Sequence, residues 1–206
     1  MVLYATDLGA PSGKAIIKVL QGGNSYALRR VTAGGPYLLG LAQYNGAWFV
    51  AAGAATEDKV YVYKDPVGDL QNNPALGLVP VTILKTTQPN YLAFSANFRF
   101  VMAESGASFA VYDAQNDKAY SYELKVPLDA GAHAVWLDGS HLTLVSNGTT
   151  IVFDYDDANQ QALSPAAAGT VPFLDPKLHY LYAEAPAPAG PGLTLTTTAL
   201  TVPAAP

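Results

Sequence analysis

Acidic side chains are concentrated in the segment FDYDDANQQAL, residues 153–163, directly after the strand-like run TTIV. Asp154, Asp156 and Asn159 place oxygen atoms at spacings that resemble part of a calcium loop. Such a loop also needs a permissive glycine and a bidentate glutamate near about its twelfth position, whereas this segment has Ala158 and no glutamate. Aspartate and asparagine are equally typical of tight turns, because their side chains bond the local backbone. We therefore predict a turn between two strands and no metal, with these three residues as weak metal candidates.

The histidines are the next groups that could do chemistry. His133, His141 and His179 fall one in each of three predicted hairpins, and none has a second histidine at the spacing of a zinc site. No Gly-x-Ser-x-Gly elbow is present, and Ser140 beside His141 is interpreted as part of a turn. We therefore predict structural packing for the histidines and no catalytic residue, so that the chain is not expected to be an enzyme.

An acidic site is the alternative to that prediction. Asp138, Asp154 and Asp175 all follow strand-like runs and could serve a hydrolase or lyase at the mouth of a channel. Two carboxylates and a histidine converging within a few ångströms would favour this alternative, and an aromatic or polar rim would favour binding.

Cofactor motifs are absent from the sequence. The stretch GAPSGK, residues 9–14, lacks the full phosphate-loop spacing and precedes a strand-like run, whereas a phosphate loop opens a helix. The chain has no cysteine, which removes thiolate metal sites and disulfides. We predict that no cofactor is bound.

Composition narrows the choice of partners. Half of the chain is apolar, 13% is charged, and the net charge is −5. Apart from Arg29 and Arg30 there is no basic cluster, so we predict no nucleic-acid partner. No apolar run reaches the ~18 residues of a membrane span, so this segment is not expected to insert directly into a membrane, and its first residues lack the pattern of a signal peptide.

The elements that must position these residues repeat along the chain. Four segments share an apolar run, a tight turn and a second apolar run, and turn residues such as Asn-Gly and Asp-Gly favour hairpins. The segments are YLLGLAQYNGAWFVAAG (37–53), YLAFSANFRFVMAESG (91–106), HAVWLDGSHLTLVSNG (133–148) and VPFLDPKLHYLYAEA (171–185).

Further strand-like runs follow each hairpin, so the predicted unit is a four-stranded meander. Spacings between turns of about 52, 41 and 37 residues bracket the roughly 40–45 residues of a propeller blade. We predict an all-β fold, a β-propeller with about four to five blades of four antiparallel strands, possibly only part of a ring. A β-sandwich is the runner-up, although it gives no reason for the repetition.

The predicted organisation is a single domain over residues 1–206. Its head strands span 1–35, its repeats span 36–88, 89–129, 130–168 and 169–202, and a tail covers 203–206. No sustained helical periodicity is present, so helical content is expected to be near zero.

Two stretches carry a resemblance to known families. LAFSANFRFVMAESGASFAVYDAQNDKAYSYEL (92–124) resembles a blade of the WD-repeat, YVTN and TolB-like propellers, and IVFDYDDANQQAL (151–163) resembles their strand ending in an acidic turn. WLDGSHL (136–142) is also similar to propellers that follow PEGA-type surface modules in small-genome bacteria. The resemblance implies the fold and, for the second group, a cell-surface setting. The Trp-Asp and Gly-His marks of true WD repeats are absent.

The main functional prediction is a non-catalytic binding or scaffold propeller in a bacterial envelope or extracellular protein. Its partner would be a protein or a glycan, held by a rim of Tyr44, Phe98, Trp136, Asp138 and Tyr155. Self-assembly into a homo-oligomer through open blade edges is a further alternative.

Overall fold

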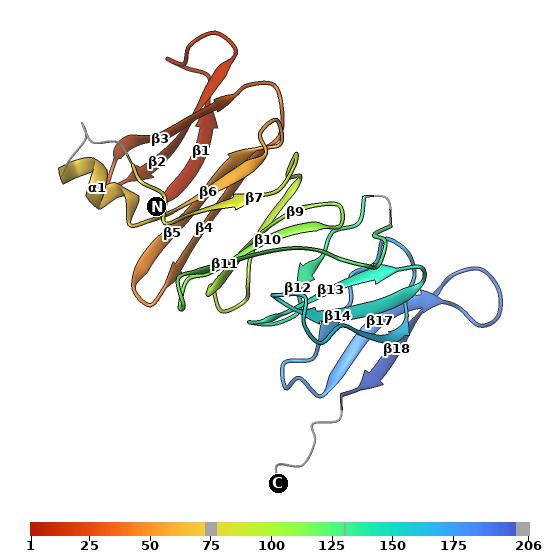
Figure 1. The fold of residues 1–206 in the computed structure, drawn as a ribbon. Helices are drawn as coiled ribbons and strands as arrows, with labels where there is room; N and C mark the ends of the chain where they lie inside the picture. The colour runs from red at the N-terminus through yellow and green to blue at the C-terminus, as the bar shows by residue number, and fades with distance from the viewer. Residues whose placement is uncertain (73–77, 130, 201–206) are drawn as a thin grey trace. The chain divides into compact units, whose positions relative to one another are not determined.

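The computed structural model describes residues 1–72, 78–129 and 131–200. The chain forms two compact units, Met1–Glu123 and Leu124–Pro206. The described strands form five antiparallel sheets, and within each sheet the strands that follow one another in the chain are hydrogen-bonded neighbours (Figure 1). A sandwich would instead connect its sheets through Greek keys. The predicted fold class, all-β with propeller-type blades, is therefore confirmed. The single domain remains a prediction, and the predicted tail 203–206 lies outside the described residues.

The first unit contains three of the sheets. The predicted head strands form a sheet of their own, and two four-stranded sheets follow. Their strands are β1 (Val2–Thr6), β2 (Lys14–Gln21) and β3 (Asn24–Thr32); β4 (Tyr37–Tyr44), β5 (Ala47–Ala54), β6 (Lys59–Lys64) and β7 (Thr82–Lys85); and β8 (Tyr91–Phe94), β9 (Phe100–Ser105), β10 (Ser108–Asp113) and β11 (Lys118–Glu123).

The second unit contains a four-stranded and a three-stranded sheet. These strands are β12 (Val135–Trp136), β13 (His141–Ser146), β14 (Thr149–Asp154) and β15 (Gln161–Pro165); and β16 (Phe173–Leu174), β17 (Tyr180–Pro186) and β18 (Leu193–Ala199). The four predicted hairpins are all present, as β4–β5, β8–β9, β12–β13 and β16–β17.

Turn chemistry explains why the hairpins form where they do. Asn45 and Gly46 have φ values of 48° and 81°, the left-handed pair that a two-residue hairpin turn requires. Asn147 and Gly148 repeat this arrangement between β13 and β14, with φ values of 49° and 75°. Each turn sets the register of the strands that it joins, and the register decides which side chains meet across the sheet.

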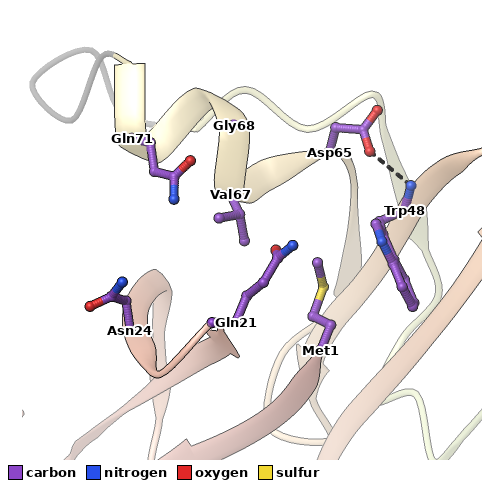
Figure 2. A pocket seen from close by; sticks show the side chains of 9 residues that line it. Met1, Gln21, Asn24, Trp48, Asp65, Val67, Gly68 and Gln71 are labelled. Carbon is purple, nitrogen blue, oxygen red and sulfur yellow. Dashed lines mark hydrogen bonds between the residues drawn. The ribbon is translucent and has the colours of Figure 1, made fainter.

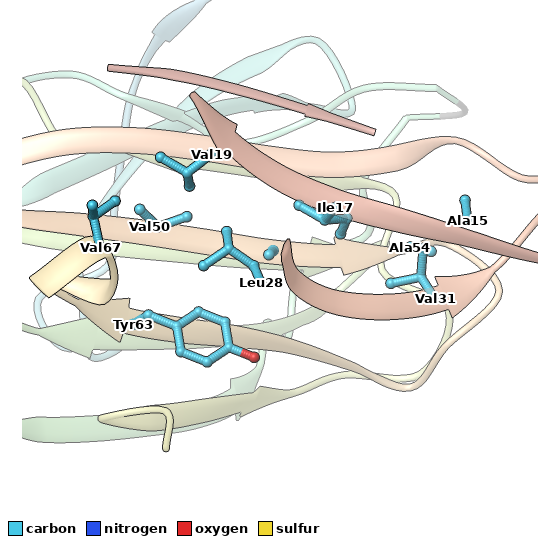
Figure 3. Packing of buried hydrophobic residues seen from close by; sticks show 10 residues of the cluster. Ala15, Ile17, Val19, Leu28, Val31, Val50, Ala54, Tyr63 and Val67 are labelled. Atoms are coloured by element: carbon cyan, nitrogen blue, oxygen red, sulfur yellow. The ribbon is translucent and has the colours of Figure 1, made fainter. Parts of the chain in front are cut away.

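The first core lies between the head sheet and the next sheet. Ile17 and Val19 of β2 and Val31 of β3 are fully or almost fully buried and pack against Val50 of β5 and Val67 (Figure 3). Strand β5 is buried on both faces, since its remaining side chains join a second core with β9 and β10. This explains why AWFVAAGA is a nearly continuous apolar run and not an alternating one.

A short helix, α1 (Pro66–Asn72), departs from the expectation of almost no helix. It occupies the insertion between β6 and β7, which the sequence indicated only as Pro-, Gly- and Asn-rich. Proline is favoured at the first helical position, and Asp69 lies in the first turn, where a negative charge is stabilising. Pro66 and Val67 are buried, so packing against the first core holds the helix in place. No helix in the described ranges has the length and apolar character needed to cross a membrane.

Candidate functional site

The candidate site begins in the second unit, at the turn of the β12–β13 hairpin. Asp138 lies in this turn, and its Oδ1 accepts hydrogen bonds from the backbone N–H groups of Ser140 (2.6 Å) and His141 (2.7 Å). Its Oδ2 lies 2.7 Å from Nδ1 of the His141 ring. The same carboxylate therefore fixes both the turn and the orientation of the imidazole.

Asp154 approaches the other nitrogen of the same ring. His141 is the first residue of β13 and Asp154 the last of β14, and the two are direct partners across the strands. Nε2 of His141 lies 3.4 Å from Oδ1 of Asp154, while Oδ2 of Asp154 accepts a hydrogen bond of 2.7 Å from Nδ2 of Asn159. The imidazole thus lies between two carboxylates, and its side chain is 45% exposed. This is the convergence that the sequence analysis named as evidence for the enzymatic alternative.

Electrostatics fix the protonation of the pair. Burial by itself would raise the pKa of Asp138, but hydrogen bonds from the His141 ring and from two backbone amides outweigh it and lower the pKa to about 2. The hydrogen bond to Asp138 raises the pKa of His141, burial opposes this, and the charges of Asp138 and Asp154 add to the increase. Because an ionised carboxylate can only accept, Nδ1 carries a proton toward Asp138.

The other hairpins show what usually occupies this strand position. In the β4–β5 and β8–β9 sheets the equivalent residues are Phe49 and Phe100, which are 3% and 0% exposed. In the β16–β17 hairpin the residue is Tyr180. This tyrosine is 44% exposed, about as much as His141. His141 therefore differs from the aromatic residues at this position in being titratable and in lying between two carboxylates.

A cavity of about 460 Å³ adjoins this cluster. Asp138, His141, Asp154, Asn159 and Gln161 supply its polar side. Its apolar side comes from the two sheets of the second unit and from the residues that flank their strands, namely Leu137, Val152, Leu163, Leu174, Leu178, Leu181 and Leu200. A largely apolar cavity with a few converging polar groups is the usual form of a small-molecule site, and such sites measure about 300–1,000 Å³.

The weak metal candidates are only partly brought together. Asp154 and Asn159 are hydrogen-bonded, whereas Oδ1 of the exposed Asp156 accepts a bond of 3.3 Å from the backbone N–H of Ala158. Asp157 and Asn159 both have left-handed φ values, 68° and 53°, as expected for a turn. Within residues 1–72, 78–129 and 131–200, no group of three histidine or acidic side chains is arranged to hold a metal ion.

The five predicted rim residues are divided between the two units. Tyr44 donates a hydrogen bond of 3.0 Å to Gln115, and Phe98 is 48% exposed in its turn. Trp136 and Tyr155 are half-buried, and neither lines the cavity beside His141. Asp138 belongs to the cavity, but as an ion-pair partner of the histidine and not as part of an aromatic rim.

His141 was predicted to be a packing residue and not a functional one. The available signal was the Asp-Gly-Ser-His order, which places an acid and a histidine three residues apart across a tight turn. A search for zinc-like spacings between histidines does not detect an aspartate–histidine pair. Asp175, the third acid of the alternative, lies in the β16–β17 turn, where Oδ1 accepts hydrogen bonds from the backbone N–H groups of His179 and Tyr180. It does not line the cavity.

Comparisons with known proteins give structural neighbours only. No family model and no curated protein matches the sequence. The chain is similar to the periplasmic gluconolactonase PpgL of Pseudomonas aeruginosa, with 14% identity, a TM-score of 0.44 and coverage of 97% of this chain and 70% of the other. It is also similar to a protein of Bacteroides uniformis named as a 6-phosphogluconolactonase, with 16% identity, a TM-score of 0.44 and coverage of 97% and 68%.

Scaffold-type propellers occur among the neighbours as well. One is the β-propeller domain of Cps50 (Swd1) from Myceliophteria thermophila, with 14% identity, a TM-score of 0.41 and coverage of 66% of this chain and 45% of the other. The neighbours are thus propellers of both kinds. The resemblance to propellers beside PEGA-type modules and the envelope location stay predictions.

The prediction that the chain is not an enzyme is corrected here. Its basis was the absence of a catalytic motif, whereas two of the structures that the chain resembles are named as lactonases. Motif searches detect only fixed local patterns, while catalytic groups are defined by their geometry in the folded chain. Low identity limits the likeness to the fold, so any activity must be argued from the residues of this chain.

Proposed function

We propose that the chain is a hydrolase of small, uncharged esters or lactones, with its active site at the Asp138–His141–Asp154 cluster. The observation that carries the proposal is the half-exposed His141, which an ionised carboxylate holds at one nitrogen beside an apolar cavity. A histidine oriented in this way through Nδ1 is a suitable general base, because its Nε2 lone pair is directed away from the orienting acid.

Each acid has its own task in this proposal. Asp138, with its pKa lowered to about 2, stays ionised over the working pH range and keeps the proton of His141 on Nδ1. Asp154, 3.4 Å from Nε2, stabilises the imidazolium that forms when His141 takes up a proton. Asp138 is a positioning residue, and His141 is the catalytic residue.

Water is the second reactant. Nε2 of His141 takes a proton from a water molecule, while the water oxygen forms a bond to the carbonyl carbon of the substrate. The bond between that carbon and the leaving oxygen then breaks, and the proton passes from Nε2 to the leaving oxygen. The products are a carboxylic acid and a hydroxyl group, so no oxidant or reductant is needed.

The lining favours an uncharged substrate. Among the described residues that line the cavity, the ionisable groups are two carboxylates and one histidine, and none is a lysine or arginine. The two carboxylates repel a phosphate or carboxylate on the substrate, and in the active form, in which His141 is neutral, no positive charge among the described lining residues offsets this repulsion. Seven aliphatic side chains suit an apolar acyl or ring portion instead. The lactonase neighbours suggest lactones as the first substrates to test, although a phosphorylated lactone does not suit this lining.

The test is hydrolysis of a panel of uncharged five- and six-membered lactones and short-chain aryl esters at about pH 8. His141→Gln should reduce kcat/KM by roughly 10²–10⁴-fold, the usual contribution of a general base. His179→Gln is the matched control, because this exposed histidine lies outside the cavity and should leave the rate unchanged. A rate that survives His141→Gln, or a wild-type rate no faster than the buffer alone, would refute the proposal.

A further inference from the structure

A second cavity lies wholly in the first unit and is unrelated to the hydrolytic cluster. It measures about 490 Å³ and is formed between helix α1, the β2–β3 turn and the start of β5 (Figure 2). Helix α1 is part of the insertion in the first four-stranded repeat. A loop that needs only to connect β6 and β7 has no reason to form one wall of a cavity, so the insertion itself requires an explanation.

Side-chain amides from separate elements meet at this cavity. Gln21 and Asn24 flank the β2–β3 turn, and Gln71 comes from the last turn of α1. Nε2 of Gln71 donates a hydrogen bond of 2.7 Å to the hydroxyl of Tyr26, which fixes this amide on the far side of the cavity. Each amide presents both a donor and an acceptor, and this combination complements hydroxyl groups, which also donate and accept.

Apolar and aromatic groups complete the lining. Val67 of α1 and Met1 point into the same space from opposite sides, and Gln21 reaches between them (Figure 2). Trp48 forms part of the wall, and its backbone N–H donates a hydrogen bond of 2.8 Å to Oδ1 of Asp65. Met1 and Val67 supply apolar surface for the C–H groups of a sugar, while the amides can bind its hydroxyls.

The charges of the lining select among polar ligands. Among the described residues that line the cavity, the ionisable groups are the carboxylate of Asp65 and the amino group of Met1, and none is a lysine, arginine or histidine. One group of each sign leaves this lining without net charge, so it offers no cluster of positive charge to hold a phosphate or an acidic sugar. We infer that this cavity binds a neutral saccharide, a mono- or disaccharide by its volume, and that helix α1 serves to build the site.

The two tryptophans of the chain give a direct assay, since Trp48 lines the cavity and Trp136 belongs to β12 of the other unit. In a Trp136→Phe protein all tryptophan emission comes from Trp48. Titration with glucose, galactose, N-acetylglucosamine and their β-linked disaccharides should give a saturable change in this emission for at least one sugar. Saturation-transfer NMR on the same samples detects binding that leaves the emission unchanged.

Matched variants decide whether the cavity is the site. Asn24→Ala and Gln71→Ala should each weaken binding by about five- to tenfold, the loss expected for one neutral hydrogen bond. Gln160→Ala removes an exposed amide in the other unit and should have no effect. The inference is overturned if no sugar binds by either method, if a sugar phosphate binds better than the free sugar, or if Asn24→Ala and Gln71→Ala bind like wild type. The readout is binding in the first unit, so failure or success of the hydrolase proposal does not affect it.

Discussion

Replacing Asp138 with asparagine tests the electrostatic core of the candidate active site. The variant keeps the size of the side chain and an oxygen for the two backbone amides, but it removes the negative charge beside His141. The pKa of Asp138 is lowered from 3.8 to about 2. At about 1.4 kcal/mol per pKa unit, and after allowance for solvent screening at this partly exposed site, the charge stabilises the fold by about 1–2 kcal/mol.

The pH range of this stabilisation follows from the two shifts. A lowered aspartate pKa gives stability that is present above 3.8 and lost as pH falls through about 2. A raised histidine pKa gives stability that is present below 6.5 and lost as pH rises through the value in the folded protein. Asp138→Asn should therefore lower the free energy of unfolding most between about pH 4 and pH 6.5.

Urea unfolding at pH 6 measures the effect, with a Trp48→Phe background so that Trp136 reports on the second unit alone. Asp156→Asn is the control, because it removes the same charge from an exposed turn of the same unit. The reasoning is refuted if both variants lower stability equally, or if the difference between wild type and Asp138→Asn does not shrink from pH 6 to pH 3.

Three further predictions concern other charged groups. The first concerns His141, which must be neutral to act as the base, so kcat/KM of the proposed hydrolysis should fall as the pH decreases through its pKa. The hydrogen bond to Asp138 raises this pKa above 6.5. A rate that increases on acidification would contradict the assignment of His141 as the base. Arg99→Met leaves the fully buried carboxylate of Asp113 without its cation and should destabilise the first unit by about 3 kcal/mol, measured by urea unfolding with Trp48 emission. Replacing Asp156 and Asp157 together with alanine should change the melting temperature by at most a few degrees, and a calcium-dependent melting shift that this variant abolishes would overturn the turn assignment.

Local signals predicted the elements of the fold well. Asn-Gly and Asp-Gly turns between apolar runs are short-range features, and each of the four predicted hairpins formed at its turn. Helix α1 was missed because its segment is short and rich in glycine and asparagine, and because burial of Val67 against distant strands holds it in place. Tertiary packing of this kind cannot be inferred from the propensity of seven residues.

The candidate site was harder to predict because it depends on register. The pairing of His141 with Asp154 requires the exact alignment of β13 with β14, and the contact with Asp138 requires the length of the β12–β13 turn. One residue of slip would place the histidine on the other face of the sheet. The sequence indicated the acids, but it did not show that a histidine lies between two of them.

Both proposed sites lie at positions where one repeat of the chain differs from the other repeats. The cavity of the first unit is built by the helix in the β6–β7 insertion. The cluster of the second unit contains a histidine at the position that Phe49 and Phe100 occupy in the first unit. Residues that recur at equivalent positions are explained by packing between sheets. The equivalent Tyr180 of the same unit is 44% exposed, so a phenylalanine at position 141 would gain only about half of the roughly 1.5–3 kcal/mol that full burial contributes. What sets His141 apart is its titratable ring between two carboxylates.

His141→Phe tests this reasoning directly. The variant restores the aromatic side chain found at the equivalent positions of the other hairpins, while it removes the imidazole from both carboxylates. At about pH 8, where part of the histidine's electrostatic contribution has been lost, we expect a free energy of unfolding equal to that of wild type or up to about 1 kcal/mol higher, together with complete loss of the proposed hydrolysis. His141→Gln, which restores no packing, should lose both activity and stability. If the phenylalanine variant is as unstable as the glutamine variant, His141 is a packing residue suited to its own surroundings, and the argument that function lies at this departure from the repeat fails.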